Sequence, residues 1–347
     1  MHKPKKNYLW NKLSDSLKKL NFDYKNLINS KILISGGTGF VGSWIVHSFA
    51  LLNKLFLLNI ELTIITNQKK NVNKYFFLKK FIKINYILSD INKIKKVDGN
   101  FTHLIHGCAN YTGERNDILK TNIGGAEKIL SILKKKKIKN ILFISSGAVY
   151  ENKNLKLKET NALVDINSKK YYAVSKVKSE KIFSEYYNKN KNINLTILRL
   201  FTFAGPGLDT LKYLAYSSAI NSRFKNNKIK LNSDGQSKRG FMHSIDMALW
   251  IIKSLTFKKK NIINVGSNEI LTIYEMSKIV SSVKYKNFKK VDLTISKNIK
   301  HNSFYVPNTN RAVKKDLKIN FTIQDAIRDH LFHKMNSKNP HRYYFND

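Results

Sequence analysis

Two side chains that can carry a proton, Tyr172 and Lys176, stand four residues apart in a stretch with the pattern of a helix start. Residues at positions i and i+4 share a helix face, so both side chains can point into one site. An ammonium group beside a phenol favours the phenolate, which makes Tyr172 a usable general base or acid near neutral pH. A Lys-rich helix also produces this spacing by chance, so its meaning depends on the residues that accompany it.

A hydroxyl that could join this pair is carried by Ser146. It follows the apolar run 141–144, which predicts a buried strand. Ligands of open α/β sheets bind beyond the carboxyl ends of such strands, so Ser146 is expected in the cleft into which Tyr172 projects. Because hydroxyl, phenol and ammonium converge there, we expect Ser146, Tyr172 and Lys176 to be catalytic.

A glycine-rich turn lies near the start of the chain, between a predicted strand at 31–35 and a predicted helix at 44–52. In such a turn Gly36 permits the tight bend, Gly39 lets the backbone approach a pyrophosphate, and Gly42 allows close packing of the helix. The N-terminus of the helix then faces the anion. This arrangement of strand, glycine turn and helix is typical of a dinucleotide-binding site.

The elements that must position these groups form an alternating series. After the first strand, apolar runs at 62–66, 84–88, 103–106 and 141–144 alternate with helical stretches. Alternation of strand and helix predicts an α/β fold with a doubly wound parallel sheet.

The end of the second predicted strand bears on the choice of cofactor. An acidic residue there would grip the ribose hydroxyls of NAD. Instead Asn67 follows the strand, with Lys69 and Lys70 close behind. Because no carboxylate repels a 2′-phosphate, the sequence allows NAD or NADP.

The chain can bury a large core, since 42% of its 347 residues are apolar. Its length predicts one large unit with a smaller lobe. The single cysteine cannot form an internal disulfide, no run of about 18 apolar residues predicts a membrane span, and the N-terminus lacks the features of a signal peptide. A soluble, cytoplasmic protein is expected. No cluster has zinc-like spacing, so no metal is expected.

The formal net charge of +40 raises the question of nucleic-acid binding. Only seven of the 63 basic residues are arginine, whereas surfaces that bind phosphate favour the bidentate arginine fork. An excess of Lys, Asn and Ile is what AT-rich coding produces. The sequence therefore argues against a nucleic-acid partner.

These motifs and several others together resemble the extended short-chain dehydrogenase/reductase family, in its NAD-dependent epimerase/dehydratase group that acts on nucleotide sugars. The resemblance, from about 30 to 335, rests on segments 36–42, 90–91, 122–125, 145–150, 172–176, 199–201, 204–207, 234–246, 264–267 and 305–307. It implies a Rossmann fold with a smaller C-terminal substrate-binding lobe, and it makes a homodimer plausible.

The resemblance also implies roles for individual residues. Tyr172 would be the catalytic acid/base, Lys176 its partner, and Ser146 the hydroxyl that binds the reacting sugar oxygen. The residues expected to bind the cofactor are Gly36, Thr38, Gly39, Phe40, Val41, Gly42, Asn67, Asp90, Ile91, Cys108, Ala109, Asn110, Asn122, Tyr172 and Lys176. The residues expected to bind the substrate are Ser146, Thr202 and Arg239, with Arg239 on a diphosphate oxygen.

The expected domain organisation follows from the same resemblance. It comprises an N-terminal helical extension at 1–30, an NAD(P)-binding Rossmann domain at 31–203 that also receives about 240–266, a substrate-binding lobe at 204–239 and 267–335, and a tail at 336–347. The extension is expected to pack against the main domain, with a membrane surface or a partner as alternatives. Asn221, Arg223 and Arg311 are further candidates for contacts with the substrate.

Departures from the family pattern narrow the reaction. Family dehydratases place Asp-Glu after the strand-end hydroxyl residue, and family decarboxylases carry a Glu at the second of these positions, whereas this chain has Gly147 and Ala148. Hydride transfer at one sugar carbon, in 4-epimerisation or 4-keto reduction, is therefore expected. Thr202 stands where several family epimerases have Asn, which leaves the sugar open. The alternatives are a nucleotide-sugar 4,6-dehydratase or decarboxylase, and a non-catalytic Rossmann-fold protein that binds RNA.

Overall fold

The computed structural model describes residues 8–134, 137–151, 155–208, 215–286, 288–296, 299–300 and 302–336. The predicted C-terminal tail lies outside the described residues, apart from Asn336.

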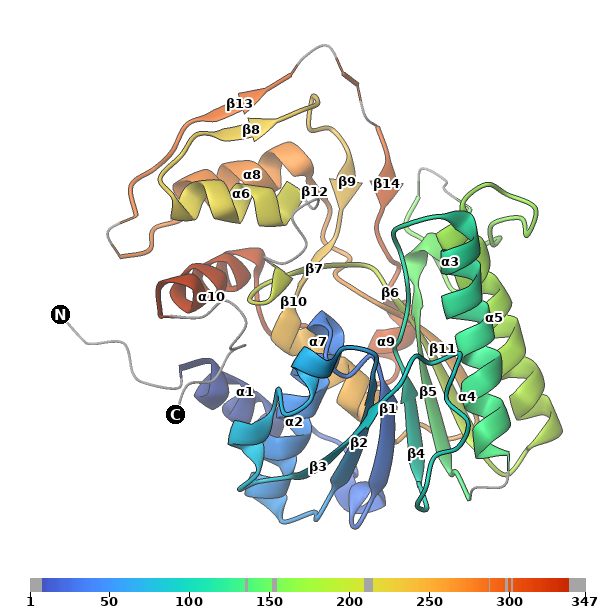
Figure 1. Cartoon of the computed structure of the whole chain (residues 1–347). Coiled ribbons are helices and arrows are strands. Elements are labelled where there is room, and N and C mark those ends of the chain that lie inside the picture. Colours follow the sequence, from blue (N-terminus) through green and yellow to red (C-terminus); the bar gives the residue numbers. More distant parts are fainter. Residues whose placement is uncertain are drawn as a thin grey trace.

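A seven-stranded parallel sheet forms the centre of the molecule (Figure 1). Its strands are β1 (Lys31–Ser35), β2 (Glu61–Thr66), β3 (Lys83–Leu88), β4 (His103–His106), β5 (Asn140–Ser146), β6 (Asn194–Leu200) and β11 (Lys260–Val265). They lie in the order β11-β6-β5-β4-β1-β2-β3, so β1 pairs with β2 on one side and with β4 on the other. The chain thus changes direction across the sheet at β1, which confirms the predicted doubly wound α/β fold.

Helices cover both faces of this sheet (Figure 1). On one face lie α2 (Phe40–Phe56) and α7 (Ser244–Ser254), with α1 (Tyr8–Lys19) packed outside them. On the other lie α3 (Arg115–Leu119), α4 (Gly125–Leu133) and α5 (Tyr171–Lys189), with a π-helical turn at Lys120–Gly124 between α3 and α4. Parallel strands buried on both faces read as continuous apolar runs, which is why the sequence pattern located them.

The N-terminal extension is part of the same core. Leu9, Trp10, Leu13 and Leu17 of α1 are buried in one cluster with residues of α2. A short 3₁₀ helix, Tyr24–Leu27, then leads to β1. The apolar face of α1 is therefore covered by the protein itself and is not available to a membrane surface. This confirms the expectation that the extension packs against the main domain. None of the described helices is long and apolar enough to span a membrane.

The C-terminal elements gather beyond the carboxyl ends of the central strands (Figure 1). Three helices, α6 (Ala215–Phe224), α8 (Ile273–Ser282) and α10 (Ile323–Asn336), contact one another there. The short strands are β7 (Thr202–Ala204), β8 (Ile229–Leu231), β9 (Lys238–Arg239), β10 (Phe241–His243), β12 (Leu271–Thr272), β13 (Leu293–Ile295) and β14 (Phe304–Tyr305), and β7 pairs with β10. The other short helices are Lys69–Asn71, Phe76–Leu78, Gly147–Val149 and α9 (Asn310–Val313). Residues of β7, α6, β9, β10, α8 and β14, and of the segments that precede β9 and β14, line the side of the cleft opposite the glycine turn and form what we call the C-terminal wall.

Candidate active site

Helix α5 and the end of β5 hold the predicted catalytic groups together. The Lys176 ammonium donates a hydrogen bond of 2.9 Å to the carbonyl oxygen of Ile144, and the Tyr172 phenol is hydrogen-bonded to the Ser146 hydroxyl. Lys176 Nζ lies 6.0 Å from the centroid of the Tyr172 ring. The structure therefore brings Ser146, Tyr172 and Lys176 into one site, as their spacing predicted.

Burial dominates the protonation of these groups. It raises the pKa of Tyr172, although the hydrogen bond from Ser146 acts in the opposite direction. It lowers the pKa of Lys176 to about 8, against the influence of Cys108 and Glu180. The sequence predicted that Lys176 would favour the phenolate, but in the protein alone the desolvation of the phenol is the larger effect. Tyr172 is therefore protonated at neutral pH and can donate a hydrogen bond.

Glu180 provides a further contact between α5 and β5, in addition to those of Tyr172 and Lys176. Glu180 had no role predicted from the sequence. Glu180 stands four residues beyond Lys176, and its carboxylate accepts a hydrogen bond of 2.6 Å from the Ser145 hydroxyl. The same carboxylate forms a buried ion pair of 2.6 Å with Arg199, whose guanidinium also donates to the Tyr150 hydroxyl at 2.9 Å. Three consecutive residues of β5 thus each bind one of three helix residues spaced by four. That i, i+4, i+8 spacing was the available signal.

Tyr305 of β14 is the second residue that sequence reasoning gave no role. Its hydroxyl is hydrogen-bonded to Ser146 and lies 3.4 Å from the carbonyl oxygen of Leu200. The Arg239 guanidinium lies 5.7 Å from the centroid of the Tyr305 ring. Ser146 is thus shared by two phenols, one from the sheet-covering helix and one from the C-terminal wall. The segment 305–307 contributed to the family resemblance, but only the folded chain shows where its tyrosine lies.

The glycine turn has the geometry that a dinucleotide pyrophosphate requires. Gly36 adopts a φ of +76°, in the left-handed region, and a Cβ at Gly42 would collide with the Gly36 carbonyl oxygen. Helix α2 begins directly after Gly39, and its first residues line the cleft, so its N-terminal amides face the space in front of the turn. The residues present therefore fit the phosphate groups of NAD or NADP.

One cleft of about 1020 Å³ connects the glycine turn with Ser146, Tyr172 and Lys176 and with the C-terminal wall. The predicted site residues that line it are Gly36, Thr38, Gly39, Phe40, Val41, Gly42, Cys108, Ala109, Ser146, Tyr172, Lys176, Thr202 and Arg239. Residues that had no predicted role also line it. They are Tyr111, in the loop after β4, and Tyr216, Ser233, Ser237, Ser303 and Tyr305 of the C-terminal wall. A cleft of this continuity can hold a dinucleotide and a second ligand side by side.

Five predicted cofactor residues do not line this cleft. The amide of buried Asn122 is hydrogen-bonded to both backbone groups of Asn110, at 2.7 and 2.9 Å, and to Ser175 Oγ at 2.8 Å. This amide lies outside the cleft lining and fixes the loop after β4 against α5. Ile91 is buried against Gly125 of α4.

The other two of the five lie at strand ends near the surface. The Asp90 carboxylate accepts a hydrogen bond of 2.8 Å from the backbone of Asn92, and Asn67 is exposed directly after β2. Both follow the carboxyl ends of their strands, β3 and β2, on the side of the sheet to which the glycine turn opens.

Two arginines with candidate substrate contacts have packing roles instead. Arg223 is 1% exposed and donates to the carbonyl oxygens of Val283 and Phe288, at 3.3 and 3.1 Å. Arg311 donates to the carbonyl oxygen of Ile262 at 3.1 Å. Neither lines the cleft.

Comparisons with known proteins agree with this geometry. The bifunctional polymyxin resistance protein ArnA of Wigglesworthia glossinidia brevipalpis is 31% identical over 289 residues, covering 76% of this chain and 42% of that protein. The chain thus spans less than half of ArnA. A putative UDP-glucose 4-epimerase of Methanocaldococcus jannaschii is 28% identical over 257 residues, covering 72% of this chain and 81% of that protein.

Solved structures share the fold. The UDP-N-acetylglucosamine 4-epimerase from Methanobrevibacter ruminantium M1, in complex with UDP-N-acetylmuramic acid, matches with a TM-score of 0.74 at 20% identity, over 89% of this chain and 99% of that one. The UDP-glucuronic acid 4-epimerase from Bacillus cereus, in complex with UDP-glucuronic acid and NAD, matches with a TM-score of 0.70 at 19% identity, over 87% and 98%.

The match to a family model covers the central sheet itself. The model described as "NAD dependent epimerase/dehydratase family" matches residues 32–266, which run from β1 to the end of β11 and include the glycine turn, Ser146, Tyr172 and Lys176. The chain therefore belongs to the NAD-dependent epimerase/dehydratase family of enzymes.

Proposed function

We propose that this enzyme transfers hydride at a single carbon of a nucleotide sugar, as a 4-epimerase or as the closely related 4-keto reductase. Its family also contains dehydratases and decarboxylases. The observation that carries the proposal is the part of the cleft around Ser146, where no described lining residue is a carboxylate and where Gly147 leaves no room for a larger side chain.

The two positions after Ser146 are occupied by apolar packing. A Cβ at Gly147 would lie 2.7 Å from Cζ of Phe201 and 2.7 Å from the Tyr305 hydroxyl. Ala148 packs against the buried cluster that contains Val164. Among the described residues that line the cleft there is no Asp or Glu. Elimination of water needs an acid and a base in addition to Tyr172, and this part of the cleft supplies neither.

The residues present suffice for the redox step. Tyr172 takes the proton of the sugar hydroxyl, and Ser146 binds the same oxygen and holds it in place. A bound oxidised nicotinamide would supply the acceptor for the carbon hydride and a positive charge that favours the phenolate of Tyr172. Lys176 adds a second positive charge at the same site, and Arg239 binds a diphosphate oxygen from its place beside Tyr305.

The proposal includes an organisation of the chain. Segments 31–203 and about 240–266 bind NAD or NADP, and segments 204–239 and 267–335 bind a nucleotide sugar. UDP-sugars are the first substrates to test, because UDP-sugars are named for the similar proteins above. A cytoplasmic homodimer is proposed, and light scattering would show it as twice the chain mass of 40.2 kDa.

Product analysis by mass tests the proposal. A panel of UDP-sugars is incubated with the enzyme and NAD, and with NADH for the 4-keto sugars. Epimerisation conserves mass and consumes no cofactor, and keto reduction adds two hydrogens and oxidises the cofactor. Loss of water or of carbon dioxide would instead establish a dehydratase or a decarboxylase.

A single substitution tests the catalytic role. Tyr172→Phe should abolish turnover while NAD binding stays close to that of the wild type, because the phenol oxygen is lost and the ring is kept. Full activity in this variant would refute the mechanism. A steep fall of RNA affinity with salt, in a chain that converts no sugar, would support the RNA-binding alternative.

A further inference from the structure

The N-terminal helix α1 meets the last described helix, α10, at a buried carboxylate. Lys12 Nζ forms an ion pair of 2.6 Å with Asp329, and the Tyr8 hydroxyl donates to the same carboxylate at 3.1 Å. The Asp329 side chain is 2% exposed. A carboxylate so far from water must be paired, and two of its partners come from the other end of the chain.

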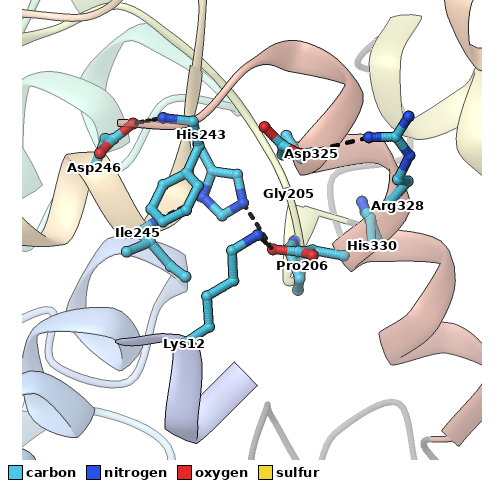
Figure 2. Close-up of polar contacts among 12 residues, drawn as sticks. Lys12, Gly205, Pro206, His243, Ile245, Asp246, Asp325, Arg328 and His330 are labelled. Carbon is cyan, nitrogen blue, oxygen red and sulfur yellow. Dashed lines mark hydrogen bonds and ion pairs between the residues drawn. The ribbon is translucent and has the colours of Figure 1, made fainter. Parts of the chain in front are cut away.

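The third partner of this carboxylate is His243, the last residue of β10, directly before α7. Its Nδ1 accepts a hydrogen bond of 2.9 Å from the backbone amide of Ile245, so its Nε2 carries the hydrogen that is donated to Asp329 at 3.0 Å. Figure 2 shows the Lys12 ammonium and the His243 ring converging on one carboxylate oxygen, that of Asp329, with the labelled His330 on α10 nearby. Burial alone would raise the pKa of Asp329, but His243 and Lys12 outweigh it and lower the pKa.

Helix α10 connects the Asp329 cluster to Tyr216, a residue that lines the cleft. The residue next to Asp329 is His330, which is fully buried and whose Nδ1 lies 3.3 Å from the Tyr216 hydroxyl. That hydroxyl also accepts a hydrogen bond of 3.0 Å from the backbone amide of Gly205. Tyr216 lines the cleft together with Arg239 and Tyr172.

The backbone after β7 is held from the cofactor side as well. The Trp44 indole of α2 donates to the carbonyl oxygen of Pro206 at 3.3 Å. Tyr216 therefore lies where α2, the turn at Gly205 and α10 meet. Its position depends on α10, and the position of α10 depends on the partners of Asp329.

We propose that Asp329 is a positioning residue for nucleotide-sugar binding. Through Lys12 and Tyr8, the N-terminal helix α1 holds Asp329 in place and so supports the substrate site. The inference rests on the proposed function, because it assigns the wall formed by Tyr216 to the nucleotide sugar. It places no residue of α1 in contact with NAD, so cofactor binding is independent of Lys12.

Two variants test the inference, each measured with UDP and dTDP as probes of the substrate side and NAD as the probe of the cofactor side. Lys12→Met removes the ammonium and keeps the length of the stem, and Tyr8→Phe removes only the hydroxyl. Each should raise the dissociation constant for the nucleoside diphosphate by at least about fivefold, and raise KM more than it lowers kcat, with NAD affinity unchanged. The matched control is Lys18→Met, because Lys18 lies on the same helix in an exposed ion pair with Asp15.

The outcomes distinguish the role of α1 from the proposed substrate class. If Lys12→Met lowers Tm but leaves the dissociation constants for nucleoside diphosphates at their wild-type values, α1 is only a structural support and the inference is wrong. An equal loss of NAD affinity would also overturn it. A wild-type chain that binds NAD but neither UDP nor dTDP would overturn the proposed substrate class, and this inference with it.

Discussion

Replacing Glu180 by glutamine tests whether the buried ion pair below the active site positions the catalytic groups. The Glu180 and Arg199 side chains are 7% and 3% exposed, and their closest atoms are 2.6 Å apart. Removing one partner of a buried pair leaves the other charge uncompensated, which costs about 3–5 kcal/mol. With an unfolding entropy of roughly 2.1 cal/mol/K per residue, a chain of 347 residues should lose about 4–7 °C in Tm.

The same substitution has a separate effect on catalysis. Burial lowers the pKa of Lys176 to about 8, and the Glu180 carboxylate raises it. Without that carboxylate the pKa of Lys176 falls further. Because the ammonium form is the active one in our mechanism, activity is present below this pKa and lost above it. The alkaline limb of the pH–rate profile should therefore move to lower pH in Glu180→Gln.

The assay combines thermal unfolding with kcat/KM measured across pH, and the control is Glu185→Gln. Glu185 lies on the same helix, but its side chain is exposed. It approaches Lys181 no closer than 4.0 Å, so this ion pair is weak. Exposed pairs of this kind contribute about 0–1 kcal/mol, so the control should match the wild type. If Glu180→Gln behaves like Glu185→Gln in both measurements, the reasoning about the ion pair is refuted.

Two further substitutions probe the reaction and the cofactor. Gly147→Asp should lower Tm by several degrees without creating dehydratase activity, because the new side chain meets Phe201 and the Tyr305 hydroxyl; a stable variant that releases water from its substrate would contradict this. Asn67→Asp places a carboxylate directly after β2, and it should weaken NADP binding relative to NAD by about tenfold or more. An unchanged ratio of the two dissociation constants would show that this position does not contact the ribose.

The sequence predicted those parts of the site that depend on local pattern. The strand before Gly36, the helix after it and the strand that ends at Ser146 could be located because each is a short apolar run with a clear neighbour. Tyr305 and Tyr216 could not be given roles, because each reaches the cleft from a segment far along the chain. The protonation of Tyr172 was predicted from its neighbour Lys176 alone, and the larger influence, burial, is a property of the folded chain.

The contact between α1 and α10 joins residues that are 317 positions apart, since Lys12 pairs with Asp329. During synthesis Lys12 leaves the ribosome long before Asp329 is made, so this contact of α1 can form only when the chain is almost complete. Contacts of such long separation form late, because the loop must close before the contact is gained. The central sheet can thus assemble first, and the contact between α1 and α10 forms as one of the last steps of folding.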